Sequence, residues 1–318
     1  MQLRPGIHRI QAPLGERFIA MYLLTGPDGA LLFDTGVADS VPGTLLPYLD
    51  EIGFDPAGIR WVISSHCDFD HTGGNAALAA VAPHAEFLAG RADVPMTEDV
   101  ELLISGRYGE FAARDRFDDP PETTAEVRRS TGLVAVTRAL DGGETFDLGD
   151  RTIEVLSVPG HSPGHLALRD AVNDTLLISD AVLGETVPTA DGRAAFPPTY
   201  RDTVAYVDSI RRLQAFDADL LLTAHYPVYE GAGVGVFLDG SLAYTERVDR
   251  VIAEVLASGE ACTSLELVRR AAADLGPWSE AAAEYLIFPM TGNLERLVQQ
   301  GRVVEGERDG IRTWRWTA

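Results

Sequence analysis

The stretch SSHCDFDHTGGN, residues 64–75, decides the fold, because it places four side chains that can bind a metal in one short loop. These side chains are His66, Asp68, Asp70 and His71. The run IRWVISSH before them is typical of a buried strand, and GGNAALAAVAP after them is typical of a helix that Pro83 ends. The loop therefore precedes a helix directly, and Asp70 taken alone could be only a helix cap.

Three further candidate ligands follow predicted strands elsewhere in the chain. VPGHSPGH carries His161, LLISDAV carries Asp180 at the end of its strand, and LLTAHYP carries His225. Four of the seven histidines thus fall into one set of candidates, which is hard to ascribe to chance. Since α/β proteins place ligands where strands end, the sequence predicts that these segments meet in one metal site.

The ordered segments resemble the metallo-β-lactamase superfamily over about residues 5–230. They are LLFDTG, the loop HCDFDH in place of H-x-H-x-D-H, PGHSPGH, the strand-end Asp180 and the strand-end His225. The resemblance implies an αββα sandwich, in which two mixed sheets lie back to back with helices outside. It also implies two metal ions at one edge of the sandwich.

The resemblance further implies a role for each residue. His66, Asp68 and His161 would hold the first metal. Asp70, His71 and His225 would hold the second, and Asp180 would bridge the two. Asp34 of LLFDTG would lie behind the site and orient a ligand by a hydrogen bond. The alternative for Asp34 is a turn residue at a strand end.

Asp68 departs from the resemblance, because the superfamily usually has a neutral His at this position. The additional anion predicts a less positive site, a weaker Lewis acid and a less acidified bound water. Its oxygen donor favours iron or manganese more than an imidazole would. Its shorter side chain predicts a first metal that is displaced, open to water or weakly held. We expect two divalent ions, with zinc as the first choice and iron or manganese as alternatives.

The predicted function is that of a dinuclear metal-dependent hydrolase, which directs a metal-bound hydroxide at a small ester, thioester or lactone. Asp70 would orient that hydroxide or take its proton. Tyr226 and Tyr200 are candidates to polarise the substrate carbonyl, with a core or rim aromatic as the alternative for each. An acidic residue at position 68 is also a mark of flavodiiron proteins. The alternative is therefore a non-haem di-iron oxidoreductase, or a protein that binds oxygen or nitric oxide, although the chain lacks a flavodoxin-like segment.

Two segments stand outside this core pattern. Residues 91–139 mix helical spacing with Pro and charge, and we interpret them as an insertion that is either a lid over the site or a surface feature. Arg107 and Tyr108 within it are candidate substrate contacts. Cys67 lies between two ligands, and because neighbouring side chains on a loop usually point apart, we expect it to pack rather than bind metal.

The C-terminal part has a different pattern. We divide the chain into a metal-binding domain, 1–232, and a C-terminal module, 233–318, whose three predicted helices and hairpin around RDG resemble a winged helix. We expect this module to pack or to provide a dimerisation surface rather than to bind DNA. Its tryptophans, Trp278, Trp314 and Trp316, are predicted core residues.

Composition limits the partners. The net charge of −22 argues against unaided binding to nucleic acid or anionic membranes, which needs a basic patch. The chain has no lysine, which excludes Schiff-base chemistry. Two distant cysteines and the lack of a signal-like or membrane-length apolar run predict a cytoplasmic protein. We expect a small-molecule substrate, with a regulatory protein on a degenerate metal site as a third possibility.

Overall fold

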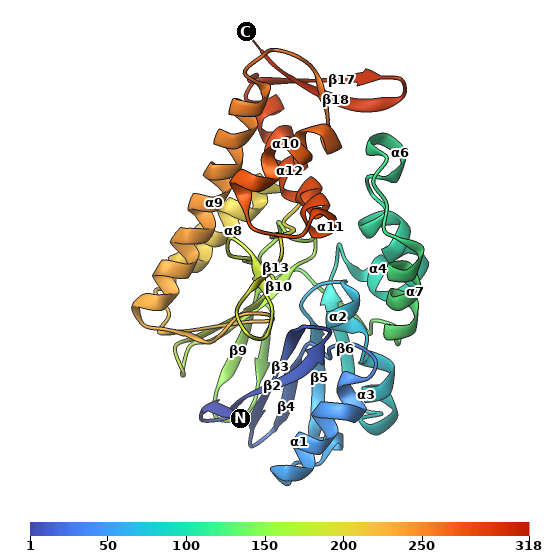
Figure 1. Cartoon of the computed structure of the whole chain (residues 1–318). Coiled ribbons are helices and arrows are strands. Elements are labelled where there is room, and N and C mark those ends of the chain that lie inside the picture. Colours follow the sequence, from blue (N-terminus) through green and yellow to red (C-terminus); the bar gives the residue numbers. More distant parts are fainter. Residues whose placement is uncertain (318) are drawn as a thin grey trace.

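In the computed structural model, which describes residues 1–317, two β-sheets lie face to face and helices cover their outer faces (Figure 1). The first sheet has the order β1 (Gln2–Arg4), β2 (Ile7–Leu14), β3 (Arg17–Gly26), β4 (Gly29–Phe33), β5 (Ile59–Ser64), β6 (Glu86–Gly90) and β7 (Arg138–Leu140). The second has the order β15 (Tyr229–Glu230), β14 (Leu220–Thr223), β11 (Thr175–Ser179), β10 (Leu166–Asp170), β9 (Thr152–Ser157) and β8 (Thr145–Asp147). The predicted αββα sandwich is confirmed.

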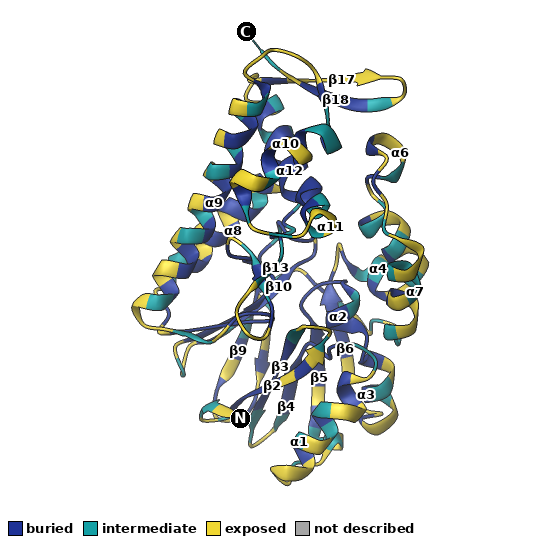
Figure 2. Ribbon diagram, viewed as in Figure 1, coloured by how far each residue is buried: buried dark blue, intermediate teal, exposed yellow. Residues whose placement is uncertain are grey.

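Apolar residues on both faces of the strands produce this layering. Leu31 packs into the cluster between the two sheets, whereas Leu32 packs under the helices outside the first sheet. Leu221 likewise faces the outer helices, and its neighbours Leu220 and Leu222 face the other sheet. Because side chains alternate along a strand, a continuous apolar run buries both faces. Figure 2 shows the result, with buried strands between helices whose outer turns are exposed.

Short helices cover the first sheet and longer ones cover the second. The first set consists of η1 (Val41–Leu45), α1 (Leu46–Glu51), η2 (Pro56–Gly58), α2 (Phe69–Thr72) and α3 (Asn75–Val81). The second sheet is covered by α8 (Thr203–Gln214) and α9 (Ala232–Leu256), and a small ribbon of β12 (Val187–Pro188) and β13 (Ala194–Phe196) lies nearby.

The hairpin of β3 and β4 shows how turn chemistry sets register. Gly26 pairs with Gly29 across a two-residue turn. Gly29 has a φ of +127°, and a Cβ there would lie 2.4 Å from Cδ of Arg60. Only glycine fits both conditions, so the segment GPDG closes the hairpin as its sequence predicts.

The amphipathic helix α8 differs in one detail from what its sequence predicts. Three- and four-residue spacing places Val204 on one apolar face with Val207, Ile210, Leu213 and Phe216. In the structure Val204 is 43% exposed, whereas Tyr206 is buried. The buried face is rotated toward the Tyr206 side of the helix, and Val204 lies outside it.

The insertion is helical and lies beside the sandwich. It contains α4 (Val94–Glu98), α5 (Val100–Leu103), the π-helical turn η3 (Ile104–Tyr108), α6 (Ala112–Asp115) and α7 (Pro121–Ser130). Its middle part reaches the C-terminal module, as Figure 1 shows for α6. Arg312 donates to both carboxylate oxygens of Asp115 at 3.0 and 2.5 Å, which ties α6 to the last strand of the chain.

The C-terminal module consists of helices and a small three-stranded sheet. After α9 come β16 (Cys262–Thr263), α10 (Ser264–Leu275), α11 (Glu280–Ala283), η4 (Glu284–Leu286), α12 (Ile287–Gln299), β17 (Val303–Arg308) and β18 (Ile311–Trp316). The three strands form a sheet of order β16, β18, β17. Thr263 and Glu266 form a capping box that starts α10.

The module shares its core with the metal-binding part. Trp314 and Leu267 of the module belong to the same buried cluster as Leu156 and Ile178 of the second sheet. The expected boundary at 232/233 falls one residue inside α9, and one continuous apolar core contains residues from both sides of it. Within residues 1–317, no helix combines the length and the hydropathy that a membrane span needs.

Candidate metal centre

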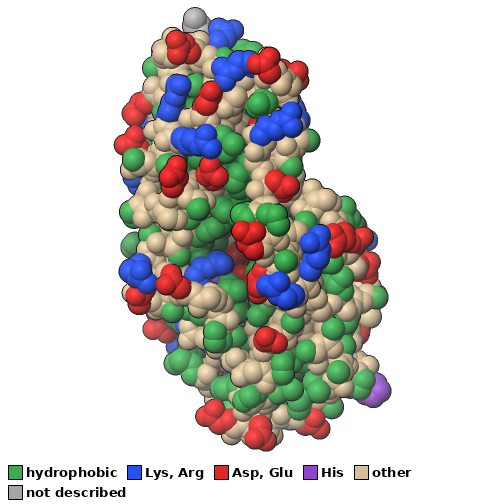
Figure 3. All heavy atoms as spheres, turned by 45° about the vertical axis from the view of Figure 1, so that its right-hand side comes forward, with side chains coloured by type: hydrophobic (Ala, Val, Ile, Leu, Met, Phe, Trp, Pro, Cys, Tyr) green, Lys and Arg blue, Asp and Glu red, His purple; other side chains and the backbone are tan. Residues whose placement is uncertain are grey.

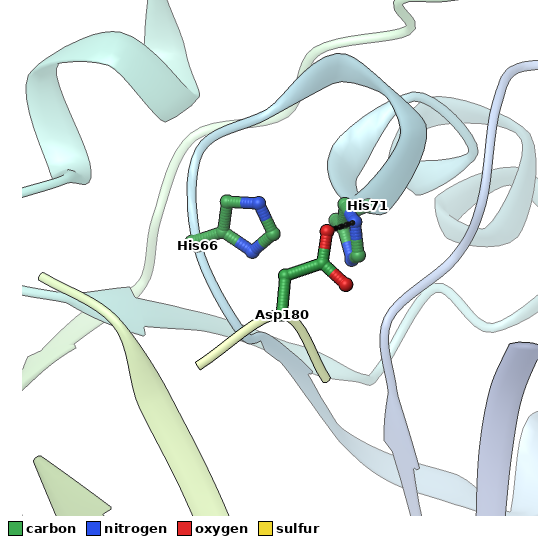
Figure 4. A group of neighbouring side chains, drawn as sticks. All are labelled: His66, His71 and Asp180. Atoms are coloured by element: carbon green, nitrogen blue, oxygen red, sulfur yellow. Dashed lines mark ion pairs between the residues drawn. The ribbon is translucent and has the colours of Figure 1, made fainter. Parts of the chain in front are cut away.

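Strand ends from both sheets converge on the predicted site. Strands β4 and β5 run parallel in the first sheet, and β11 and β14 run parallel in the second. Their carboxyl ends therefore lead to one edge, where the chain continues into Asp34, His66, Asp180 and His225. Figure 4 shows His66, His71 and Asp180 gathered around one point from two segments of the chain. All seven predicted ligand side chains are found in such groups.

A first group joins the loop after β5 to the loop after β9. Nε2 of His161 lies 3.2 Å from Nε2 of His66 and 3.2 Å from Oδ2 of Asp68. Nε2 of His66 lies 3.3 Å from the same Asp68 oxygen. This is the donor set that the sequence assigns to the first metal.

A second group contains the ligands predicted for the other metal, together with Asp180. Nε2 of His225 lies 3.2 Å from Oδ2 of Asp180 and 3.5 Å from Oδ2 of Asp70. Nε2 of His71 lies 3.5 Å from Oδ2 of Asp180. Asp180 also forms a candidate group with His66 and His71, which is the position that a bridging carboxylate requires.

Hydrogen bonds to the outer ring nitrogen orient three of the imidazoles. Nδ1 of His161 lies 3.1 Å from the Thr199 carbonyl, and Nδ1 of His225 lies 2.7 Å from the Phe18 carbonyl. A carbonyl can only accept a hydrogen bond, so Nδ1 carries the ring proton and the Nε2 lone pair faces the centre. This is the arrangement that metal-binding histidines adopt.

Asp34 orients the third imidazole, as expected from its place behind the site. Its Oδ2 lies 2.9 Å from Nδ1 of His71, and it also accepts from the hydroxyls of Ser65 and Ser179 at 2.9 and 2.8 Å. Its Oδ1 accepts from the Ser65 backbone amide at 2.7 Å. The residue adopts a φ of 65°, an unusual backbone conformation that directs the carboxylate inward.

Two atoms of the second group suit a bound cation. Nε2 of His71 and Oδ1 of Asp180 are buried and have no hydrogen-bond partner within the described chain. Leaving such atoms unpaired costs about 1–3 kcal/mol each. Although burial opposes a charged imidazole, Asp34, Asp70 and Asp180 raise the pKa of His71 well above its usual range. The excess of negative charge and the unpaired atoms fit a divalent ion.

The first group contains a cation of the protein's own, Arg107. This guanidinium donates from Nε and Nη2 to the two carboxylate oxygens of Asp68, the latter at 2.9 Å. Nη1 donates to the His161 carbonyl at 2.9 Å, and Nη2 lies 3.0 Å from Nε2 of His161. Burial opposes ionisation of Asp68, but Arg107 and His66 outweigh it and hold the pKa of Asp68 well below its usual range.

This ion pair corrects the predicted consequence of Asp68. The sequence suggested that the additional anion makes the site less positive and so weakens its Lewis acidity. The charge of Asp68 is instead balanced by Arg107, which the sequence indicated only as a substrate contact. Nothing in the spacing of this buried arginine connects it to a loop 39 residues away.

Other residues that shape the site had no sequence assignment. His165, the second His of PGHSPGH, is buried and stacks on His66 with ring centroids 4.7 Å apart. Asp93 of the insertion accepts from the Gly164 amide at 2.7 Å and from the Ser162 hydroxyl at 2.5 Å. These contacts hold the loop that carries His161.

The two candidate tyrosines do not reach the pocket. The hydroxyl of Tyr226 accepts from the Gly184 amide at 2.9 Å, and its ring packs against Phe237. The hydroxyl of Tyr200 donates to Asn293 at 3.0 Å, and its ring stacks on Tyr206. Both are structural, because their hydroxyls are engaged by other parts of the chain, and neither is retained as a catalytic group.

Cys67 also points away from the centre. It packs with Leu103 and Val127 of the insertion, and its thiol lies 4.0 Å from the sulfur of Met96. Burial raises the pKa of this thiol well above its usual range. A neutral, buried thiol is a packing group, as expected.

A pocket of about 220 Å³ opens onto the candidate ligands Asp68, Asp70, His161, Asp180 and His225. Its walls are largely apolar and come from several parts of the chain, including Val127 of the insertion and Leu183, Val187, Phe196 and Phe288. Figure 3 shows a hollow on this face, between the C-terminal module and the sandwich. The insertion and the module are therefore both walls of the site.

Comparisons with known proteins agree with this geometry. Residues 14–225 match the model of the metallo-beta-lactamase superfamily. An N-acyl homoserine lactonase from Rhizobium johnstonii is 27% identical, covering 71% of this chain and 90% of its own. An acyl-coenzyme A thioesterase from Gallus gallus is 31% identical, covering 61% of this chain and 65% of its own.

Solved structures extend the likeness to the whole fold. A metallo-beta-lactamase family protein from Thermus thermophilus superposes with a TM-score of 0.76 over 99% of both chains. Its sequence is only 19% identical, so this likeness concerns the fold alone, including the C-terminal helices. The family match covers the segments that carry the site, and the chain belongs to the metallo-beta-lactamase superfamily.

Proposed function

We propose that the protein hydrolyses a small ester, thioester or lactone that carries an apolar acyl group. The observation that carries the proposal is the second ligand group, whose unpaired atoms lie beside a pocket with apolar walls. The named relatives are a lactonase and a thioesterase, and both are hydrolases that act on acyl–heteroatom bonds. The chain is accordingly a hydrolase of this superfamily.

The residues of the second group would hold a divalent metal. They are Asp70, His71, Asp180 and His225. Such an ion supplies acidified water and a Lewis acid for the acyl carbonyl. Zinc is our first choice, because it binds imidazole nitrogen and carboxylate oxygen, and the group offers two imidazoles and two carboxylates at a pocket from which water can reach the ion.

The chain's own groups perform the remaining tasks. Asp70 lines the pocket and is only 8% exposed. Its carboxylate can therefore orient the attacking water and accept a proton from it. Leu183, Val187 and Phe288 would bind the acyl chain and exclude bulk water, which strengthens the electrostatic interactions within the site.

The pocket favours small substrates over large polyanions. Two arginines line it, and one of them, Arg107, is already paired with Asp68. The other, Arg17, lies 5.8 Å from the ring of Phe196 and could contact one polar or anionic group of the substrate. A single available cation suits a compact ligand in a chain of net charge −22.

The di-iron alternative loses its main support. It depended on Asp68 as a harder and more anionic ligand, and both of its oxygens are engaged by Arg107. Zinc-bound, colourless protein would agree with a hydrolase. Near-stoichiometric iron with visible absorption, together with oxygen or nitric oxide turnover, would favour the oxidoreductase instead.

The test is a substrate panel with metal-replete protein. Aryl esters, acyl thioesters and acyl homoserine-type lactones of increasing chain length would be assayed for kcat/KM with wild type and with Asp70→Asn. We expect hydrolysis of at least one class, a preference for apolar acyl chains, and a loss of about 10²–10⁴-fold in the variant. Equal rates for wild type and Asp70→Asn would contradict the assigned proton acceptor, and no turnover of any class would contradict the proposal.

A further inference from the structure

We propose that the guanidinium of Arg107 takes the place of the first metal, so that the chain binds one divalent ion, in the second ligand group, rather than two. This concerns the number of ions and the role of Arg107. It does not depend on which substrate is hydrolysed.

The donors of the first group are already used. Asp68 accepts from Arg107 through both carboxylate oxygens. Nη2 of Arg107 lies 3.0 Å from Nε2 of His161, where it meets the lone pair that a metal would need, because Nδ1 of that ring faces the Thr199 carbonyl. A guanidinium has donors and no lone pairs, so this contact requires Nε2 of His161 to accept. Two of the three predicted ligands are thus engaged by a cation.

The second group shows the opposite pattern. Its unpaired buried atoms, Nε2 of His71 and Oδ1 of Asp180, have no hydrogen-bond partner, and no arginine pairs with either residue within the described part of the chain. Both groups consist of imidazole and carboxylate donors of similar burial. The two groups differ in that the first contains the guanidinium of Arg107 and the second contains no arginine.

A metal and the guanidinium could not share the first group. Nη2 lies within hydrogen-bond distance of both Asp68 and His161, while a zinc–imidazole bond is about 2.0–2.1 Å long. An ion held by His66, Asp68 and His161 would need the same Nε2 lone pair of His161 and the same Asp68 oxygen that this nitrogen already engages. It would also meet a cation that stays protonated at any working pH.

Arg107 is built into its position. It lies in the π-helical turn η3, is 7% exposed, and is followed by Tyr108, whose hydroxyl accepts from the Phe69 amide at 3.2 Å. Leu103, just before this turn, packs against Cys67 within the ligand loop. The insertion therefore contacts the ligand loop on both sides of Arg107. If the Arg107 side chain moved away, the buried carboxylate of Asp68 would lose the cation that neutralises it.

The measurement is the zinc stoichiometry of the full chain. Chelator-treated protein would be titrated with zinc by calorimetry and with cobalt by visible absorption, and metal content would be determined after gel filtration. We expect one ion for wild type and two for Arg107→Met, in which Asp68 and His161 are released. Arg107→Gln, which keeps a polar side chain beside Asp68, should also bind two and guards against misfolding of the first variant.

The matched control is Arg312→Met. Arg312 of the C-terminal module is about as buried as Arg107, with 6% exposure, and makes a bidentate pair with the buried Asp115 of the insertion, away from the ligand groups. Its removal should leave one ion per chain. Two ions of similar affinity in wild type, or one ion in a folded Arg107 variant, would overturn the proposal. One ion without hydrolysis of any substrate would overturn only the proposed function.

Discussion

Oδ2 of Asp34 lies 2.9 Å from Nδ1 of His71, and both side chains are almost completely buried. Four donors converge on this carboxylate, from His71, from the hydroxyls of Ser65 and Ser179, and from the Ser65 backbone amide. An amide at position 34 would turn an NH₂ group toward some of these donors. The carboxylate thus fixes the ring that presents its Nε2 to the metal.

Asp34→Asn should weaken zinc binding by about 10–100-fold without changing the ligands themselves, because outer partners of this kind orient metal-binding histidines. Competition with a chromophoric chelator would measure the change. The exposed Asp50→Asn provides the control, with an expected affinity equal to that of wild type. An undiminished affinity in the Asp34 variant would mean that His71 needs no such support.

Removal of the metal should abolish hydrolysis reversibly. We expect EDTA-treated protein to lose activity and zinc to restore it. Asp180→Ala removes the carboxylate between His71 and His225 and should lower kcat/KM by about 100–1,000-fold, equivalent to several kcal/mol of lost stabilisation. Far-ultraviolet circular dichroism would establish that the variant is folded. Full activity in metal-free protein would contradict any metal-dependent mechanism.

Phe288 tests whether the C-terminal module shapes specificity. This residue of α12 lines the pocket and packs edge-on against Phe111 of the insertion. Phe288→Ala should lower kcat/KM for a long acyl chain about 10–100-fold more than for an acetyl group, because pocket contacts discriminate by about 1–3 kcal/mol.

The ratio between long and short substrates is the informative measurement for Phe288. Partial unfolding lowers both rates equally and leaves the ratio of long-chain to short-chain kcat/KM unchanged, whereas the loss of a pocket contact with the acyl chain changes this ratio. Val236→Ala, at a position 72% exposed on α9, should leave both rates as they are. If Phe288→Ala had the same ratio as wild type, the acyl chain would not bind against Phe288.

The fold and the ligands could be predicted because the informative residues follow strands. Buried apolar runs identified β5, β9, β11 and β14, and the polar residues after these runs were expected at a common edge. The ordered series of segments then indicated the superfamily. Local patterns were sufficient here, since each ligand lies within a few residues of the strand that positions it.

The Arg107 contact could not be predicted, because it joins a loop to an insertion through tertiary packing alone. No periodicity relates Arg107 to Asp68, and a π-helical turn has no clear sequence signal. The error at Tyr226 has a related cause. Because Tyr226 follows His225 directly, its side chain was expected to point into the site as His225 does. Adjacent side chains point apart, however, and the Tyr226 hydroxyl lies at the Gly184 amide.

Tyr22 offers a test of the core that supports the site. Its hydroxyl is buried between the sheets and donates to the carbonyl of Thr223 at 2.7 Å, two residues before His225. Burial raises the pKa of Tyr22 to about 12, although the nearby guanidinium of Arg9 acts in the opposite direction. The unfolded chain ionises this phenol near pH 10, so the folded state holds the proton longer.

Because the folded pKa is higher, the contribution of Tyr22 is fully present below about pH 10 and is lost as the pH rises toward 12. Two pH units correspond to about 3 kcal/mol at most. We expect Tyr22→Phe to be less stable than wild type by about 1 kcal/mol at pH 8, from the lost hydrogen bond. Between pH 10 and 12 this difference should shrink and then reverse. Urea unfolding of both proteins across this range would measure it, and a difference independent of pH would show that the hydroxyl is not held in an apolar, hydrogen-bonded position.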